Sequence, residues 1–378
     1  QGFGVMVSHA FGAKDFKLLR HYVALSLILT LIISLLLTIP TVTASRLLLA
    51  WMHTPENIIA MADAYIKVIF AGILLTMAYN VLSGILRGIG DSRTPLYFLI
   101  LSSVLNIILD VVLIVYTGLG TAGAAYATII AQGVSAVLCF FYMYRKYDIL
   151  RTRHEDYYLD SAGVKNMLAI GVPMALNYSI TAIGTMIMQS AVNVFGSSVV
   201  AAFTAASKVS NIATQSMPTL GTAMATYCGQ NLGAGKYDRI YAGMRQGPFL
   251  CFGAAASAAA ICIFGGRFIV SWFVSNPSEE IFSSAMQYLT IASWFFLPLA
   301  MIFLYRNALQ GLDQGLIPML SGVVELACRF GVIALIPAST GFFGVCFADP
   351  AAWAGAGIPL FITYLLWEHR MKQCSKAA

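Results

Sequence analysis

The chain of 378 residues is 59% hydrophobic and only 10% charged. An ordinary soluble domain has about 25% charged residues, so this composition excludes a soluble globular protein whose surface faces water. We interpret the net charge of +6 as a signal of membrane topology and expect no nucleic-acid partner, because the basic residues collect in alternate connections.

Apolar blocks of roughly 20 residues, the length that crosses the hydrocarbon layer as a helix, recur along the chain. They predict an all-α integral membrane protein, since lipid offers backbone groups no partner outside a helix. About eleven segments are expected, at residues 1–10, 23–40, 66–86, 96–115, 122–144, 169–195, 199–227, 244–264, 285–305, 316–336 and 351–367. The first block has no charged region or signal peptide before it and is interpreted as the tail of a membrane segment.

The Lys and Arg residues divide unevenly between the connections that join these blocks. The connections on one side hold only Arg46 and Arg267, while Lys67, Lys208 and Arg329 lie within blocks. The positive-inside rule therefore places the other connections and the C-terminus in the cytoplasm. The basic residues of that group are Lys14, Lys17, Arg20, Arg87, Arg93, Arg145, Lys146, Arg151, Arg153, Lys165, Lys236, Arg239, Arg245, Arg306, Arg370, Lys372 and Lys376.

An internal repeat organises the chain. Residues 11–14 (FGAK) recur as 232–236 (LGAGK), and residues 86–88 (LRG) with Pro95 recur as 309–311 (LQG) with Pro318. Gly233 follows Gly12 by 221 positions, and Pro318 follows Pro95 by 223. The repeat predicts an N-terminal lobe at residues 1–146, a polar cytoplasmic linker at 147–162 and a C-terminal lobe at 163–378.

The repeat also predicts what a complete first copy contains. Because the second copy opens near Gly163, the first is expected to open roughly 60 residues before Gln1. The first helix and part of the second are thus expected to be missing. We expect two six-helix bundles related by a pseudo-twofold axis along the membrane normal, which is a transporter architecture.

Several motifs carry a family resemblance. Residues 229–235 read GQNLGAG and resemble the signature of multidrug and toxic compound extrusion (MATE) transporters. Residues 8–14 (SHAFGAK) are similar to its first-half counterpart, with His9 in place of the usual Gln. Residues 84–91 (GILRGIGD) resemble the loop after the fourth helix, and 171–173 (GVP) the opening of the seventh. The resemblance covers essentially the whole chain and points to the DinF-type bacterial branch.

The resemblance implies a fold of two six-helix bundles and a secondary active antiporter. Such proteins export organic cations and other amphiphilic drugs in exchange for inward Na⁺ or H⁺, and they need no other cofactor. A multi-pass protein of the bacterial plasma (inner) membrane follows, surrounded by lipid and expected as a monomer with a cytoplasmic C-terminus. The alternative is a lipid-linked-oligosaccharide flippase of the same superfamily, which would need a strongly cationic cleft for pyrophosphate.

Asp110 is the first candidate for chemistry, because an ionisable residue within hydrocarbon is costly and is therefore a functional candidate. The alternative is that it lies near the outer interface and is hydrated there. Asn106 lies one helical turn earlier on the same face. A carboxylate with an amide oxygen can hold Na⁺, and the carboxylate alone can take a proton. In DinF-type relatives a Thr on the sixth helix and an Asp on the first helix complete this cation site. The Thr position matches Thr128, and the Asp is expected in the missing region before Gln1.

The second half of the chain offers a further group of polar candidates. Glu325 and Arg329 are spaced to pair on one helix face, which favours a structural role and leaves a second-lobe proton or substrate site as the alternative. Asn177 and Gln189 either face a cleft or bond a neighbouring helix. Lys208 precedes several polar residues, so one face of its helix is expected to line the cleft.

The sequence argues against an ATP-driven pump and against an enzyme. Residues 229–236 hold five residues between the two glycines where a phosphate loop needs four, and Tyr237 replaces its Ser or Thr. All five histidines fall at predicted helix ends or loops, and the seven cysteines show no metal-site spacing. We therefore expect no catalytic residues, and no metal beyond Na⁺ at Asp110.

Overall fold

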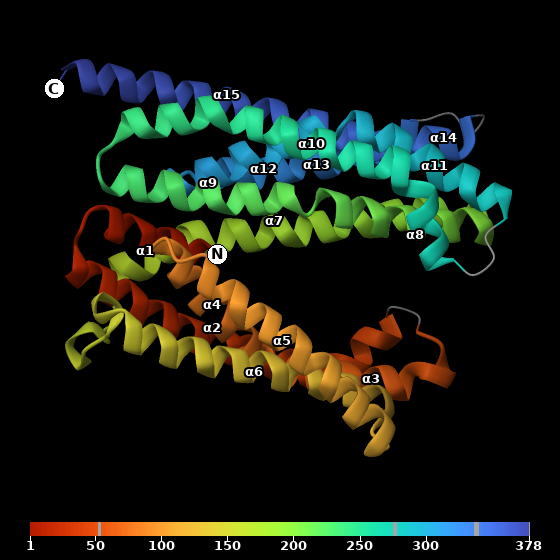
Figure 1. The fold of residues 1–378 in the computed structure, drawn as a ribbon, viewed down its shortest axis with the longest axis horizontal. Helices are drawn as coiled ribbons and strands as arrows, with labels where there is room; N and C mark the ends of the chain where they lie inside the picture. Colours follow the sequence, from red (N-terminus) through yellow and green to blue (C-terminus); the bar gives the residue numbers. More distant parts are fainter. Residues whose placement is uncertain (52–53, 275–277, 336–339, 378) are drawn as a thin grey trace. The chain divides into compact units, whose positions relative to one another are not determined.

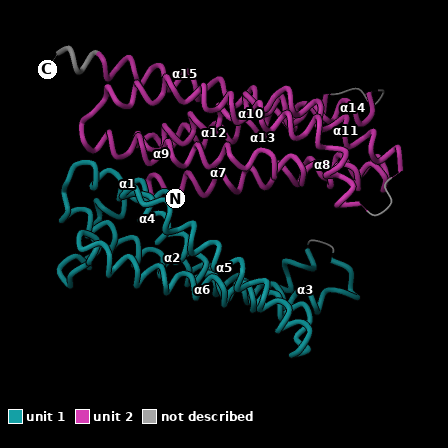
Figure 2. The backbone as a smooth tube through the Cα atoms, viewed as in Figure 1, with its two compact units in different colours: residues 1–167 teal, residues 168–378 magenta. Residues whose placement is uncertain are grey.

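The computed structural model describes residues 1–51, 54–274, 278–335 and 340–377. Across these ranges the chain is almost entirely helical, with no β-strand. The helices form two compact units, Gln1–Met167 and Leu168–Ala378 (Figure 2). The lobe boundaries expected at residues 146 and 163 flank a linker and stay a prediction.

The first unit is built from helices that follow one another along the chain (Figure 1). They are α1 Gly2–Gly12, α2 Phe16–Trp51, α3 Glu56–Ala71, α4 Ile73–Gly88, α5 Arg93–Val111, the π-helix η1 Val112–Tyr116, α6 Gly120–Lys146, and the 3-10 helices η2 Asp148–Leu150 and η3 His154–Asp156. Within this unit α6 packs against α3, α4 and α5. Its core contains the fully buried side chains of Leu19, Leu25, Ile85 and Leu86.

In the second unit, two helices, α7 and α8, precede those that repeat this plan. Its helices are α7 Ser161–Asn193, α8 Ser197–Thr214, α9 Ser216–Gly233, α10 Tyr237–Phe273, α11 Glu279–Trp294, α12 Phe296–Gly311, α13 Leu316–Leu335, α14 Gly341–Val345 and α15 Ala348–Ala377. The N-terminus of α11 is capped by the Ser278 hydroxyl, which accepts a bond from the Ile281 N–H, and Glu279 and Glu280 follow in its first turn.

Seven of the described helices are long and apolar enough to cross a membrane, and nine spans result if each bent pair counts as one. The bent pairs are α3 with α4, at 45°, and α11 with α12, at 52°. Of the other expected blocks, 1–10 falls on α1, which is only 11 residues long, and 199–227 falls on the more polar α8 and α9. Residue 336, the expected end of one block, lies outside the described residues.

The internal repeat is confirmed in the local structure of the two units. Helices α3, α4 and α5 begin 223 positions before α11, α12 and α13. The backbone turns also match, because Lys14 and Gly235 follow α1 and α9 with φ values of 57° and 68°. Gly90 and Asp313 follow α4 and α12 with φ values of 95° and 62°. In both copies, the matching helices are therefore followed by a residue in the left-handed conformation.

A close helix contact recurs at one glycine in each unit. A Cβ at Gly88 would lie 2.9 Å from the carbonyl oxygen of Gly4, so α4 packs directly on the backbone of α1. At the matching position of the second unit, a Cβ at Gly311 would collide with the carbonyl oxygen of Ala225 on α9. Small residues allow helix backbones to approach this closely within a membrane. This contact explains why both copies of the repeat keep a glycine at that position.

The segment that joins the two halves is fastened to the start of α2. The Arg20 side chain lies 3.3 Å from the Asp156 carboxylate. The His21 ring bonds the Asp156 carbonyl oxygen at 3.1 Å and the Asp160 carboxylate at 2.7 Å. The pKa of Asp160 is lowered, first because the Gly163 N–H donates to the carboxylate and then because His21 bonds it. Residues 147–160 are thus held to the first unit by polar contacts.

Candidate functional site

Asp110 lies at the end of α5, in one of the most apolar spans of the chain. Its Oδ1 atom is buried and has no hydrogen-bond partner among the described residues. A buried polar atom without a partner costs free energy, so such an atom calls for an explanation, and an unplaced ion is one of those available. The π-helix η1 begins two residues later, and π-helical turns are frequent at functional sites.

The structure brings two of the three expected cation ligands together. The Asn106 amide donates a 3.3 Å hydrogen bond to the Thr128 hydroxyl across the contact between α5 and α6. No hydrogen bond joins Asp110 to either side chain among the described residues. A carboxylate, an amide and a hydroxyl from two packed helices supply the oxygen ligands that a hard cation prefers. The donor set therefore fits Na⁺, and the carboxylate alone fits a proton.

A close backbone contact fixes the position of α6 near this site. A Cβ at Gly123 would lie 2.8 Å from the carbonyl oxygen of Leu113, which belongs to η1. The Thr128 hydroxyl in turn donates to the Ala124 carbonyl oxygen at 3.0 Å, which orients it on α6. The glycine thus allows α6 to approach the segment that follows Asp110, and the local backbone holds Thr128 in place.

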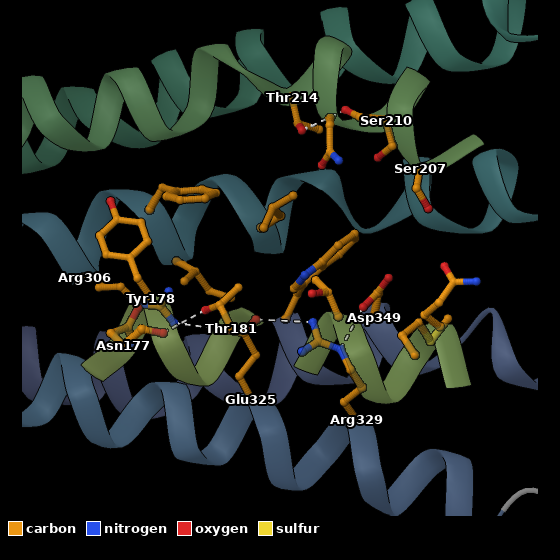
Figure 3. A pocket seen from close by; sticks show the side chains of 18 of the residues that line it. Asn177, Tyr178, Thr181, Ser207, Ser210, Thr214, Arg306, Glu325, Arg329 and Asp349 are labelled. Carbon is orange, nitrogen blue, oxygen red and sulfur yellow. Dashed lines mark hydrogen bonds and ion pairs between the residues drawn. The ribbon is translucent and has the colours of Figure 1, made fainter. Parts of the chain in front are cut away.

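The second unit contains a pocket of about 550 Å³. Helices α7, α8, α11, α12, α13 and α15 contribute its walls. In the close view, the labelled side chains of α8 lie at one edge and the arginine and carboxylate side chains at the other (Figure 3). All five residues expected in a second-lobe site line this pocket, namely Asn177, Gln189, Lys208, Glu325 and Arg329. Their role in binding stays a prediction.

A chain of four charged side chains forms one wall of the pocket. Arg306 donates to Glu325 at 2.9 Å, and Arg329 contacts the other Glu325 oxygen at 3.4 Å. Arg329 also donates to Asp349 at 2.9 Å, and the Tyr288 hydroxyl donates to the second oxygen of Asp349 at 2.9 Å. Arg306, Glu325 and Arg329 are each less than 9% exposed. Two cations and two anions thus neutralise one another within a buried network.

This network corrects the interpretation of Arg306 as a residue of a cytoplasmic connection. The structure places it inside α12, where it is buried against α13. The sequence patterns predicted no role at this site for Asp349 or Tyr288. Both Arg306 and Asp349 lie one or two positions beyond the expected apolar blocks, so a boundary error of that size concealed two of the four charges. An acid beside a long apolar block was the only sequence signal for Asp349.

The other expected residues differ in how they are held. The Asn177 amide donates to the Pro318 carbonyl oxygen on α13 at 3.0 Å, and Gly322 leaves room for it because a Cβ there would lie 2.6 Å from that nitrogen. Asn177 therefore both lines the pocket and bonds a neighbouring helix. Gln189 donates to Asn193 on its own helix at 3.0 Å. Lys208 is exposed on α8.

The described residues thus define a helical, multi-pass membrane protein with a carboxylate oxygen that is buried without a partner in one unit and a polar pocket in the other. The profile of the MatE family matches residues 1–112 and 173–335. The chain belongs to this family, and it is a membrane transporter of the MATE class.

Named relatives and solved structures agree with this assignment. The chain is 29% identical over 345 residues to the "Probable multidrug resistance protein YpnP" of Bacillus subtilis, covering 90% of this chain and 76% of that protein. It shares its fold with a crystal structure of a MATE protein in complex with MaL6, with a TM-score of 0.90 and 22% identity over 100% of this chain and 84% of that one. An outward-facing multidrug resistance MATE transporter of the MOP superfamily matches with a TM-score of 0.89, 22% identity and the same coverage.

Proposed function

We propose that the protein is a secondary active antiporter that exports amphiphilic drugs in exchange for Na⁺ or H⁺ by alternating access. The resemblance adds organic cations to the candidate substrates, and the names of the relatives support multidrug efflux. Binding of the coupling ion in the first unit would favour one arrangement of the transporter over another. A ligand shifts such an equilibrium only through its different affinity for the two states.

The observation that carries the proposal is the unpartnered Asp110 carboxylate within an apolar helix. A charged side chain within the hydrocarbon of a membrane costs a few kcal/mol unless it is paired or neutralised. Among the described residues no basic side chain forms an ion pair with it, so a small cation or a proton is the simplest compensation. The nearby Asn106 and Thr128 oxygens favour Na⁺, because a lone carboxylate would need only a proton.

Export from proteoliposomes tests this proposal. Vesicles loaded with an amphiphilic dye should show protein-dependent dye efflux when a Na⁺ gradient is imposed, or when a pH gradient is imposed. The two gradients are applied separately, with an ionophore that collapses each one as its control. Efflux that continues unchanged after both gradients have been collapsed would contradict ion-coupled antiport.

The rival function, flipping of a lipid-linked oligosaccharide, fits the charges of the pocket less well. Its walls carry three cationic and two acidic side chains, and a pyrophosphate would need a larger excess of positive charge. Translocation of a polyprenyl pyrophosphate between the leaflets of the same vesicles, in the absence of any ion gradient, would favour the flippase instead.

For the membrane setting, we propose a monomer in the bacterial plasma (inner) membrane, embedded in lipid, with residues 147–160 and the C-terminus in the cytoplasm. The basic residues near these segments support this orientation. Named relatives come from the bacteria Bacillus subtilis and Thermotoga maritima, which supports a bacterial plasma membrane as the location of this protein.

The orientation can be measured with a single cysteine. Arg153 is well exposed in the segment that joins the two halves. With the seven native cysteines replaced, Arg153→Cys should resist an impermeant thiol reagent in intact cells and react fully after permeabilisation. A cysteine in place of Glu279, at the start of α11, should behave in the opposite way. Labelling of the Arg153→Cys protein in intact cells would show that this segment lies outside the cytoplasm and would contradict the proposed topology.

A further inference from the structure

The charges around the pocket of the second unit do not cancel. Its walls hold the cationic side chains of Lys208, Arg306 and Arg329 but only the acidic side chains of Glu325 and Asp349. The two arginines are engaged with the two acids at 2.9 to 3.4 Å, and these four residues form a neutral network. One positive charge, that of Lys208, remains uncompensated at the pocket.

Lys208 has no acidic partner in the second unit. Its ammonium lies 5.3 Å from the centre of the Phe273 ring, and no carboxylate of the described residues lies within ion-pair distance of it. The positions that the structure leaves undescribed contain no Asp or Glu in the sequence. A cation on an aromatic ring keeps its full charge, because the ring offers only its quadrupole. The ammonium is therefore available to an anionic ligand.

The rest of the pocket suits an apolar body of moderate size. Met174, Tyr178, Phe203, Phe303 and Trp353 line it together with hydroxyl and amide side chains. Its volume of about 550 Å³ lies within the usual range of small-molecule sites, roughly 300–1,000 Å³. Aromatic and methionine side chains accept varied apolar shapes without a fixed geometry. Specificity must then come from the few charged and polar groups.

We propose that this pocket binds amphiphilic compounds that carry one acidic group, a carboxylate or a similar monoanion, with Lys208 as the residue that selects them. This inference rests on the proposed export function and names its substrate class. The apolar body occupies the aromatic part of the pocket, and the acid pairs with the Lys208 ammonium. A simple organic cation meets an uncompensated positive charge instead, so it binds more weakly.

Equilibrium binding to two matched aromatic probes tests this assignment. The full-length protein is placed in nanodiscs of phosphatidylcholine, and the dissociation constants of 2-naphthoate and 2-naphthylmethylammonium are measured by equilibrium dialysis. The wild type should bind naphthoate about tenfold more tightly than the ammonium probe. Lys208→Gln should remove that preference, and Lys208→Arg should keep it.

The control is Lys165→Gln, which removes the same charge from an exposed lysine that does not line the pocket. It should leave both dissociation constants unchanged. Equal affinity for the two probes in the wild type, or a naphthoate affinity that survives in Lys208→Gln, would overturn the inference. The assay needs no ion gradient, so it can fail while coupled export in proteoliposomes succeeds, and the two failures are distinguishable.

A second arm distinguishes a soluble acid from a lipid headgroup. Phosphatidylglycerol is added to the nanodiscs at constant ionic strength, and naphthoate binding is measured again in the wild type and in Lys208→Gln. If the occupant is a soluble acid, adding phosphatidylglycerol should not weaken the naphthoate binding that depends on Lys208. Competition by the anionic lipid in the wild type alone would show that the headgroup is the occupant, and this would overturn the assignment of a soluble acid.

Discussion

Asp110→Asn is expected to reduce coupled efflux from proteoliposomes to the level of protein-free vesicles. The amide has nearly the same shape as the carboxylate but can neither bind a proton nor offer a negative charge to Na⁺. The coupling ion then gains no differential affinity for one state of the transporter, and its gradient can do no work on the substrate. Efflux of a fluorescent dye under each imposed gradient provides the measurement.

Neighbouring substitutions show whether the loss is specific to the ion site. Asn106→Ala and Thr128→Ala each remove one neutral oxygen, worth about 1 kcal/mol, and should raise the half-maximal Na⁺ concentration by roughly fivefold. Asp238→Asn removes an exposed carboxylate near the start of α10 and should leave transport unchanged. Wild-type efflux by Asp110→Asn would place the coupling site elsewhere.

Glu325→Gln is expected to destabilise the second unit strongly, because Glu325 is the carboxylate shared by Arg306 and Arg329. Without it, among the residues that the structure describes, Arg329 keeps Asp349 as an acidic partner and the buried Arg306 keeps none. Breaking a buried ion pair from one side typically costs about 3 kcal/mol or more, because the remaining charge has lost its compensation. The yield of monodisperse protein after heating, followed by size-exclusion chromatography, measures the effect.

A matched control and a compensating variant separate charge from packing. Glu368→Gln breaks the exposed pair of Glu368 with Lys372 on α15 and should cost less than about 0.5 kcal/mol. Combining Glu325→Gln with Arg306→Gln removes one charge of each sign and should recover part of the lost stability. If Glu325→Gln were as stable as the wild type but inactive, while Asp110→Asn exported normally, the ion site would belong to the second unit.

Only part of the candidate ion site could be predicted from the sequence. Asp110 and Asn106 share a helix face because they lie one turn apart, and this follows from the helical period alone. The contact of Asn106 with Thr128 required a second helix, and only the resemblance to known transporters pointed to it. The unpartnered state of Asp110 Oδ1 emerged only from the packed structure, because it depends on every side chain around it.

Most of the charged network in the second unit could not be predicted from the sequence. Glu325 and Arg329 could be paired from their spacing, and that pair is present at 3.4 Å. Each has a closer partner, however, 19 or 20 positions away on another helix, at Arg306 and Asp349. No periodicity links residues on different helices, because the rotation and depth of each helix are set by packing against all of its neighbours.

By itself, the sequence determined that this protein is helical, lies in a membrane, repeats one plan twice and belongs with the MATE transporters. These properties are local, since apolar length, helical period and turn residues act within one segment. The tertiary structure alone decided that Arg306 is buried within α12 rather than exposed in a connection, that two acids neutralise two arginines, and that Lys208 has no acidic partner at the pocket. The physical reason is that charge compensation depends on distances between helices, and only the folded packing sets those distances.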